Sequence, residues 1–389
     1  MKENKSVRLG IIGLGNMGSS HAKNILQGKI PGLTLAAVCD QNSERLTAYE
    51  KEEGVTLFTD ADSFFASGEV DAVLIATPHY DHTTLGVVAL EKGLHVLVEK
   101  PISVHKADCE RLIAAYKNED QVFAAMFNQR TDPRYQKLRK LIQEGELGDL
   151  KRIQWTITDW FRTDFYYASG GWRATWAGEG GGVLLNQCPH QLDLWQWLFG
   201  MPDKVRAHCT LGKFHDIEVE DDVTAYLEYD NGCTGVFITT TGEAPGTNRL
   251  EVAGDRGRVV IEGESFAFTR NEVPTTEHCK TATAGFSRPE VWEVQIPTKG
   301  YGEQHVGILK NFAKAILDGE PLIAQAKEGI HSVELGNAML YSGLNDQTVN
   351  LPLDAAAYES FLQEKIATST YKKKVVETKA DADDFSQSF

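Results

Sequence analysis

The first 128 residues alternate between short apolar runs and longer segments whose apolar residues recur with a helical period. An alternation of strand-like runs with helical segments is typical of a doubly wound parallel sheet with helices on both faces. We therefore predict an α/β domain of this kind over residues 1–128. Its predicted strands cover residues 7–12, 33–39, 55–58, 70–76, 95–98 and 122–127.

The pattern changes after residue 128. A helix is predicted over residues 132–143, and several later segments alternate apolar and polar residues, as half-buried strands do. We therefore predict an α+β domain over residues 129–371 with an open, mainly antiparallel sheet. Residues 372–389 are polar and charged, and we expect them to be disordered or loosely docked. The predicted strands cover residues 151–159, 204–211, 223–228, 234–240, 249–252, 258–262 and 266–269, and the later helices residues 305–318, 326–344 and 355–365.

Composition narrows the class of protein. The 389 residues are 42% hydrophobic and 24% charged, as in ordinary globular proteins, and the net charge of -16 argues against a nucleic acid or an anionic membrane as the main partner. No apolar run approaches the ~20 residues of a membrane span, and the run over 9–14 is too short for a signal peptide. The six cysteines are scattered, which indicates neither a zinc site nor a disulfide framework and fits a reducing cytoplasm.

A glycine motif lies between the first predicted strand and the helix that follows it. Gly13, Gly15 and Gly18 permit a tight turn, close approach of the backbone to a pyrophosphate, and close packing of the helix on the strand. The start of the helix, with Asn16 and Met17, offers N–H donors to the phosphates. The motif in this context predicts a Rossmann dinucleotide site.

An acidic residue ends the second predicted strand. Asp40 follows Gly18 by 22 residues, the position from which a carboxylate accepts hydrogen bonds from the ribose hydroxyls and repels a 2′-phosphate. The nearest positive charge after it is Arg45. We therefore predict NAD rather than NADP as the cofactor. The alternative is a glycine-rich turn beside a solvated aspartate.

A charged pair ends the fifth predicted strand. The apolar run over residues 95–98 is followed by Glu99, Lys100 and Pro101, so the lysine is expected at the carboxyl edge of the sheet, where open α/β sheets bind ligands. Two interpretations are open: a catalytic amine, or a surface lysine paired with Glu99. The nucleotide motif favours the first.

Other residues after strands are expected beside the cofactor, namely Thr77, Pro78, His79 and Asn128, together with Glu99 and Lys100. His79 and His82 have a spacing that a metal pair could use, but no carboxylate or cysteine accompanies them at ligand spacing. We therefore expect no metal. His79 is expected either to line the nicotinamide ribose or to cap a helix.

A loop in the second domain is dense in aromatic residues and arginine. Aromatic faces stack on the C–H faces of sugar rings, and arginine binds hydroxyls or a carboxylate, so the loop predicts a carbohydrate site. A hydrophobic lid or a subunit interface would use similar residues. The residues expected to contact substrate here are Arg162, Tyr166, Trp172 and Arg173.

A run of three glycines, residues 180–182, precedes Asn186 and His190. The glycines permit close approach of cofactor and substrate, which favours His190 as a group that moves a proton. The alternative is a core histidine bonded to Asp193. Asn186 is expected to contact substrate. It could also cap the following helix, since Pro189 is tolerated only in a first turn, and a capping role does not exclude substrate contact by the same amide.

These motifs together resemble the glucose-fructose oxidoreductase, inositol dehydrogenase and MocA family over about residues 6 to 345. The resemblance implies a Rossmann domain joined to an open-sheet domain, with the nicotinamide in the cleft between them. It also implies that Lys100 and His190 assist proton transfer while hydride passes to nicotinamide, and that the common aspartate is replaced here by Asn186. The motifs are Gly13-x-Gly15-x-x-Gly18, Ala76-Thr77-Pro78, Glu99-Lys100-Pro101, and Gly180-Gly181-Gly182 followed by His190-x-x-Asp193.

The expected function is an NAD-dependent dehydrogenase that acts on a secondary alcohol of a sugar, an inositol or a sugar derivative. Lys100 and His190 are rival bases, and a neutral Asn186 weakens the case for His190. One alternative is an NAD-assisted glycoside hydrolase or lyase without net redox change. The other is a nonenzymatic NAD-binding regulator, and the presence of both Lys100 and His190 argues against it. A homodimer or homotetramer through the open sheet is expected, with a small carbohydrate or polyol as the other partner.

Overall fold

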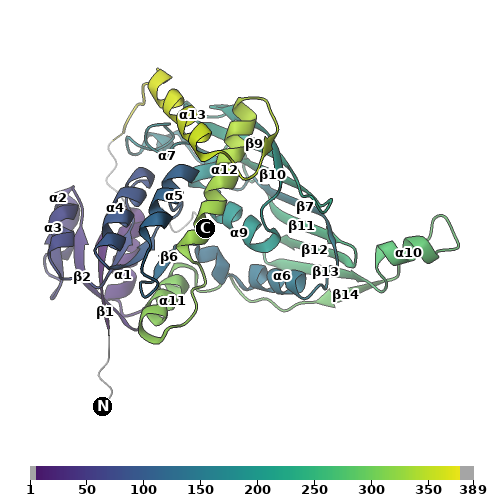
Figure 1. The fold of residues 1–389 in the computed structure, drawn as a ribbon, viewed down its shortest axis with the longest axis horizontal. Helices are drawn as coiled ribbons and strands as arrows, with labels where there is room; N and C mark the ends of the chain where they lie inside the picture. The colour runs from purple at the N-terminus through teal and green to yellow at the C-terminus, as the bar shows by residue number, and fades with distance from the viewer. Residues whose placement is uncertain (1–5, 377–389) are drawn as a thin grey trace, which may run out of the picture.

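The computed structural model describes residues 6–376 and contains two sheets, each with its own hydrophobic core (Figure 1). The first sheet is wholly parallel, with strand order β3-β2-β1-β4-β5-β6. This order reverses direction beside β1, as in a dinucleotide-binding fold. The strands are β1 Val7–Ile12, β2 Leu33–Cys39, β3 Thr56–Phe58, β4 Ala72–Ile75, β5 His95–Val98 and β6 Phe123–Ala125.

Helices cover the first sheet because its strands are apolar on both faces; β4, for example, is buried at every residue. One covering helix comes from far along the chain: Ile308, Leu309 and Phe312 of α11 pack into the core of the first sheet. The predicted domain boundary at residue 128 places α11 in the second domain and does not anticipate that this helix packs on the first sheet. The helices that follow β1 to β5 are α1 Asn16–Leu26, α2 Ser43–Leu46, α3 Ala61–Ala66, α4 His79–Glu91 and α5 Lys106–Ala115, and α11 spans Gln304–Asp318.

The second sheet has nine strands in the order β14-β13-β12-β11-β7-β10-β9-β8-β15. Its pairs are antiparallel except for β7 and β10, so the predicted mainly antiparallel sheet is confirmed. The strands are β7 Leu150–Ile157, β8 Lys204–Leu211, β9 Glu220–Glu228, β10 Thr234–Thr240, β11 Asn248–Gly254, β12 Gly257–Glu262, β13 Ser265–Asn271, β14 Val291–Gln295 and β15 Val349–Asn350.

Helices α6, α9 and α12 lie on the side of the second sheet that faces the first domain, and α10 projects from the far end (Figure 1). Trp155 of β7 and Trp195 of α9 are fully buried between sheet and helices. The predicted homodimer or homotetramer through the open sheet stays a prediction. The helices of this part are α6 Pro133–Gln143, α7 Asp164–Ala168, α8 Val183–Asn186, α9 Pro189–Phe199, α10 Thr275–Thr281, α12 Gly329–Leu344 and α13 Ala355–Thr368, and short 3-10 turns occur at Thr47–Tyr49, Asn128–Thr131 and Ala326–Glu328.

The start of the predicted tail contacts the second domain. Val376 N donates to Ala168 O at 3.0 Å, and the Lys373 amine donates to Arg173 O. These bonds place residues 372–376 beside the loop in which the sequence predicted a carbohydrate site. The rest of the predicted tail, residues 377–389, lies outside the described residues. Within residues 6–376, no helix combines the length and apolar character needed to cross a membrane.

Candidate active site between the two domains

The register of the first sheet brings the sequence motifs to one edge. Ile12 pairs with Cys39 on one side and with Ile75 on the other, and Ile75 in turn pairs with Val98. Each of these residues ends its strand, so the glycine turn, Asp40, Thr77 and Lys100 emerge together. A cleft of about 1350 Å³ opens there and is lined by residues of both domains.

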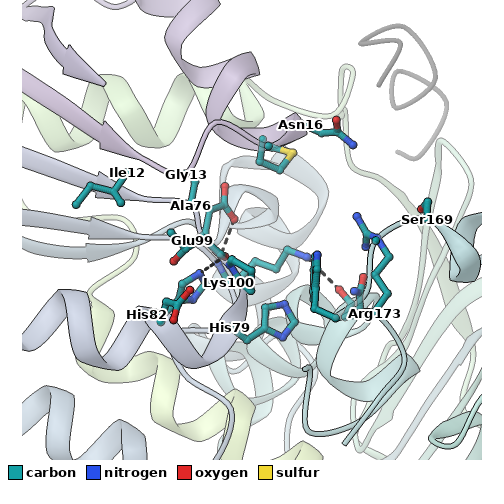
Figure 2. A pocket seen from close by; sticks show the side chains of 18 of the residues that line it. Ile12, Gly13, Asn16, Ala76, His79, His82, Glu99, Lys100, Ser169 and Arg173 are labelled. Carbon is teal, nitrogen blue, oxygen red and sulfur yellow. Dashed lines mark hydrogen bonds between the residues drawn. The ribbon is translucent and has the colours of Figure 1, made fainter. Parts of the chain in front are cut away.

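Most of the predicted site residues line this cleft. Figure 2 shows Gly13, Ala76 and Glu99 on one side, Ser169 and Arg173 on the other, and the Lys100 side chain extended between them. The predicted site residues in the lining are Gly13, Gly15, Asn16, Met17, Asp40, Thr77, Pro78, His79, Glu99, Lys100, Arg162, Tyr166, Trp172, Arg173, Asn186 and His190.

The glycine turn has the geometry that a bound pyrophosphate requires. Gly13 has a φ of +93°, and a Cβ there would lie 2.6 Å from Ala76 O, so only glycine fits. A Cβ on Gly15 would meet nothing within 4 Å, which leaves the backbone open to the cleft at the start of α1. These features fit the pyrophosphate of a dinucleotide.

Asp40 is held rigidly beside this turn. Its Oδ2 accepts from Leu14 N at 2.7 Å and its Oδ1 accepts from Asn42 N at 2.8 Å. Arg45 Nη1 approaches Oδ2 to 3.2 Å from the exposed side. The fixed carboxylate suits the ribose hydroxyls of NAD and opposes a 2′-phosphate.

The variant Asp40→Asn is expected to bind NADH about fivefold more weakly, since the neutral amide loses about 1 kcal/mol of charge-assisted hydrogen bonding. It is also expected to discriminate less against NADPH, because the negative charge is gone. Fluorescence titration with both reduced cofactors measures the two effects. Glu44→Gln removes a neighbouring charge from α2 and serves as the matched control. Unchanged NADH affinity in Asp40→Asn would contradict the assignment of Asp40 to the ribose.

Two predicted cofactor contacts do not line the cleft. Gly18 lies beneath the turn, where a Cβ would come within 1.8 Å of Gly13 O, so its role is to let α1 pack closely. Asn128 donates from Nδ2 to Gln304 Oε1 at 2.7 Å and is thereby bound to the start of α11. Both therefore lie outside the lining of the cleft.

The alternative interpretation of Lys100, a surface lysine paired with Glu99, does not agree with the structure. It is partly buried, and its Nζ donates to Asn186 O at 3.0 Å. Glu99 is buried and contacts His21 instead, with 2.8 Å between Oε1 and Nε2. Burial lowers the pKa of Lys100, and the nearby Arg173 and Arg162 add to this, while Glu99 and Glu179 oppose it.

Glu99 remains ionised in spite of its burial. Burial alone would raise its pKa, but the contact with His21 and the positive groups near it lower the value to about 2. Sequence reasoning missed His21, which lies on α1 and is 78 residues from Glu99 in the chain. It also missed His305, which lines the cleft from α11 and whose pKa burial lowers to about 4.

His190 is buried at the start of α9 and faces the cleft. The alternative that Asp193 holds it is wrong, because the Asp193 carboxylate accepts from Arg130 Nε at 2.8 Å and Nη2 at 2.6 Å. Among the described residues no group bonds His190 Nδ1. Burial lowers the pKa of His190 well below its ordinary value, and Lys100 and His305 lower it further.

Asn186 does not cap a helix. It is the last residue of α8, and Cys188 occupies the cap position before Pro189 without a side-chain bond. Its Nδ2 donates to Glu179, and its Oδ1 accepts from the Tyr166 hydroxyl at 3.1 Å. Glu179 was not recognised in the sequence, although it directly precedes the three glycines.

His79 does not cap a helix either, since Pro78 holds the cap position and α4 begins with His79. Its ring packs edge-on against Trp172 of the second domain, with 5.5 Å between ring centroids. The two ring nitrogens of His82 lie 2.7 Å from Pro101 O and 2.9 Å from Thr77 O, so His82 ties the loops beside the cleft together. Within residues 6–376 no group of three or more His, Cys, Asp and Glu is placed to hold a metal ion.

The aromatic and arginine residues of the second domain form one wall of the cleft. The Arg173 guanidinium lies 4.7 Å from the centre of the Tyr166 ring and 4.6 Å from that of Trp172, and Nη1 donates to the Tyr166 hydroxyl at 2.9 Å. Arg162 lies 5.2 Å from the Tyr166 ring and donates to Phe161 O at 2.9 Å. Within the described part of the chain, neither arginine forms a salt bridge with a carboxylate.

Comparison with known families gives a match in each domain. Residues 7–127 match the family described as "Oxidoreductase family, NAD-binding Rossmann fold". Residues 135–260 match the "GFO/IDH/MocA C-terminal domain". Together the two matches cover more than half of the chain.

Individual relatives match along nearly the whole length. Myo-inositol 2-dehydrogenase of Thermotoga maritima is 26% identical over 354 residues, covering 89% of this chain and 98% of the relative. Levoglucosan dehydrogenase of Pseudarthrobacter phenanthrenivorans is 24% identical over 389 residues, covering 90% and 99%. The crystal structure of the WlbA dehydrogenase of Bordetella pertussis, in complex with NADH and UDP-GlcNAcA, superposes with a TM-score of 0.75 at 25% identity and covers 90% of this chain and 100% of that one.

Proposed function

The chain belongs to the GFO/IDH/MocA family of oxidoreductases, and from this membership we propose that it oxidises a secondary alcohol of a sugar, an inositol or a sugar derivative. Its first domain is an NAD-binding Rossmann domain, and NAD is the cofactor. The relatives that are named for inositol and levoglucosan support a polyol or sugar as the substrate class.

One observation carries the proposal: a partly buried amine projects into the cleft between the glycine turn and the wall of aromatic residues. Lys100 is delivered there by β5, and burial lowers its pKa toward the range in which an amine acts as a base. His190 enters the same cleft from the second domain, close enough for the charge of Lys100 to lower its pKa. A binding protein without chemistry would need neither group.

Lys100 and His190 have different roles in the proposed reaction. Oxidation of a secondary alcohol removes a hydride and a proton, and the chemistry that NAD supplies when bound is acceptance of the hydride. The neutral Lys100 amine takes the hydroxyl proton, and the ammonium that forms donates to Asn186 O, as Nζ does in the structure. His190, kept neutral by burial, forms a hydrogen bond with the reacting hydroxyl and orients it.

Sugar acids are the substrates to test first. Arg162 and Arg173 line the cleft without a carboxylate partner among the described residues, and a guanidinium binds a carboxylate through paired hydrogen bonds. Trp172 and Tyr166 offer faces for a sugar ring. The acidic sugar nucleotide bound to the WlbA dehydrogenase supports the same class.

The proposal is tested by screening sugars, inositols, sugar acids and glycosides with NAD. NADH absorbance and release of an aglycone are followed in parallel. We expect NADH to accumulate with at least one sugar, polyol or sugar acid. Release of an aglycone without accumulation of NADH would overturn the proposal in favour of an NAD-assisted hydrolase. NADH binding without turnover of any compound would favour a regulator.

A further inference from the structure

Glu179 is a buried carboxylate that the proposed reaction does not use. It is 2% exposed and lies in the loop that carries Arg173 and leads into the three glycines. Its Oε2 accepts from Ala174 N at 2.5 Å, and its Oε1 accepts from Asn186 Nδ2. Both carboxylate oxygens therefore have partners: the N–H of the residue that follows Arg173, and the side-chain amide of Asn186, which lines the cleft.

The bond from Asn186 determines how that amide lies. Because a carboxylate only accepts, the NH2 group of Asn186 must face Glu179, and Oδ1 must face the other way. There Oδ1 accepts from the Tyr166 hydroxyl at 3.1 Å and from Gln187 Nε2 at 3.0 Å. The Tyr166 hydroxyl in turn accepts from Arg173 Nη1 at 2.9 Å. A single chain of hydrogen bonds thus runs from Glu179 to Arg173.

We propose that Glu179 is a positioning residue of the active site: its carboxylate fixes the Asn186 amide and supplies the negative charge that faces the Lys100 amine from the second domain. This proposal rests on the dehydrogenase function proposed above. Asn186 is neutral, and its backbone carbonyl is the group that accepts from Lys100 Nζ. Glu179 therefore acts on the amine both through its charge and through the residue that holds the amine in place.

The charges around the Glu179 carboxylate and the Lys100 amine agree with this role. Burial raises the pKa of Glu179 above its ordinary value, and Arg173, the Ala174 N–H, Asn186 and Lys373 oppose part of that rise. Glu220 faces Glu179 from β9, where burial raises its pKa to about 7. The charged and titratable groups that face Lys100 are Glu99 at the end of β5, Glu179 and Arg173 of the loop before α8, Arg162 of the loop after β7, His79 of α4, Cys188 at the cap of α9, His190 of α9 and His305 of α11.

The sign of the effect follows from the charges. Glu179 raises the pKa of Lys100, so removing its charge lowers that pKa. Since the neutral amine is the base, the acidic limb of the kcat/KM profile then moves to lower pH. Arg173 lowers the pKa of Lys100, so removing the guanidinium moves the limb to higher pH.

The test uses Glu179→Gln in the full-length enzyme and two readouts. The first is the pH dependence of labelling of the Lys100 amine by trace acetic anhydride, measured on its peptide by mass spectrometry without substrate. The second is the pH profile of kcat/KM. We expect both to move to lower pH by about one unit, and KM to rise as the Asn186 amide loses its fixed partner. Glu179→Asp keeps the charge but is one methylene shorter, so it is expected to restore the two pH profiles while KM stays raised, because the shorter side chain no longer holds the Asn186 amide. Arg173→Gln is expected to shift the profiles to higher pH.

Glu218→Gln is the matched control, because Glu218 accepts from Trp176 N of the same loop but does not face Lys100. Its profiles are expected to match those of the unaltered enzyme. Labelling and kcat/KM profiles that stay in place in Glu179→Gln would overturn the role of Glu179. The labelling experiment needs no substrate, so its result stands apart from failure of the substrate screen, which would overturn the proposed function instead. If Glu179→Gln does not fold, Glu179→Asp and Arg173→Gln are measured in its place. An unchanged KM in Glu179→Asp, together with an unchanged labelling profile in Arg173→Gln, would equally overturn the proposal.

Discussion

Replacing Lys100 with methionine is expected to lower kcat/KM by at least about 100-fold, because general-base catalysis contributes roughly that much or more and the variant has no amine to take the hydroxyl proton. Methionine has a similar length and suits a partly buried site, so the cleft keeps its shape. Nζ bonds only Asn186 O among the described groups, which limits the structural cost of removing it. The measurement is steady-state kinetics with a substrate found in the screen.

Two controls separate chemistry from binding. The affinity for NADH, measured by fluorescence, is expected to change little, because the glycine turn and Asp40 are untouched. Lys92→Met removes an exposed lysine from the end of the neighbouring helix α4 and is expected to leave turnover as it was. Lys100→Arg keeps the charge but cannot release its proton, so it is expected to be as inactive as Lys100→Met. Normal turnover in either Lys100 variant would refute the assignment of Lys100 as the base.

Much of the fold could be predicted because the local signals agree with the tertiary structure. The apolar runs of the first domain are largely buried, except in the edge strand β3, and all six became strands of one parallel sheet. Two of the elements that were missed lie outside the hydrophobic cores. Strand β14 is exposed at four of its five residues although three of the five are apolar, and α10 has no buried residue, so neither is held by the core burial on which the predictions were based.

The site was predictable where strand ends carry it and not where contacts span the chain. Lys100 and Asp40 follow buried strands, so their place at the sheet edge could be inferred from the pattern alone. The partners of these groups come from distant segments: His21 contacts Glu99 across 78 residues and Lys100 bonds Asn186 across 86. The prediction that Asn186 caps a helix was wrong because α8 and α9 are separate helices, and a break of two residues leaves Cys188 before Pro189.

A second large loss of activity is expected from replacing His190, even though Lys100 rather than His190 is the proposed base. His190→Ala is expected to lower kcat/KM by at least about tenfold, since it removes a group that orients the reacting hydroxyl. The pKa of His190 is well below its ordinary value because of burial, Lys100 and His305, so the imidazole is already neutral near pH 7. The His190 imidazole therefore does not change its protonation state over the pH range in which the Lys100 amine loses its proton.

The acidic limb of the kcat/KM profile is therefore expected to keep its shape in His190→Ala and to move to slightly higher pH. Its shape is kept because Lys100 still titrates, and the small shift follows because removal of the imidazole lets water reach the amine and weakens the effect of burial on its pKa. His190→Gln, which keeps a polar side chain, is expected to recover part of the lost activity. Loss of the acidic limb in His190→Ala would make the histidine the titrating base and Lys100 a group that only binds the hydroxyl.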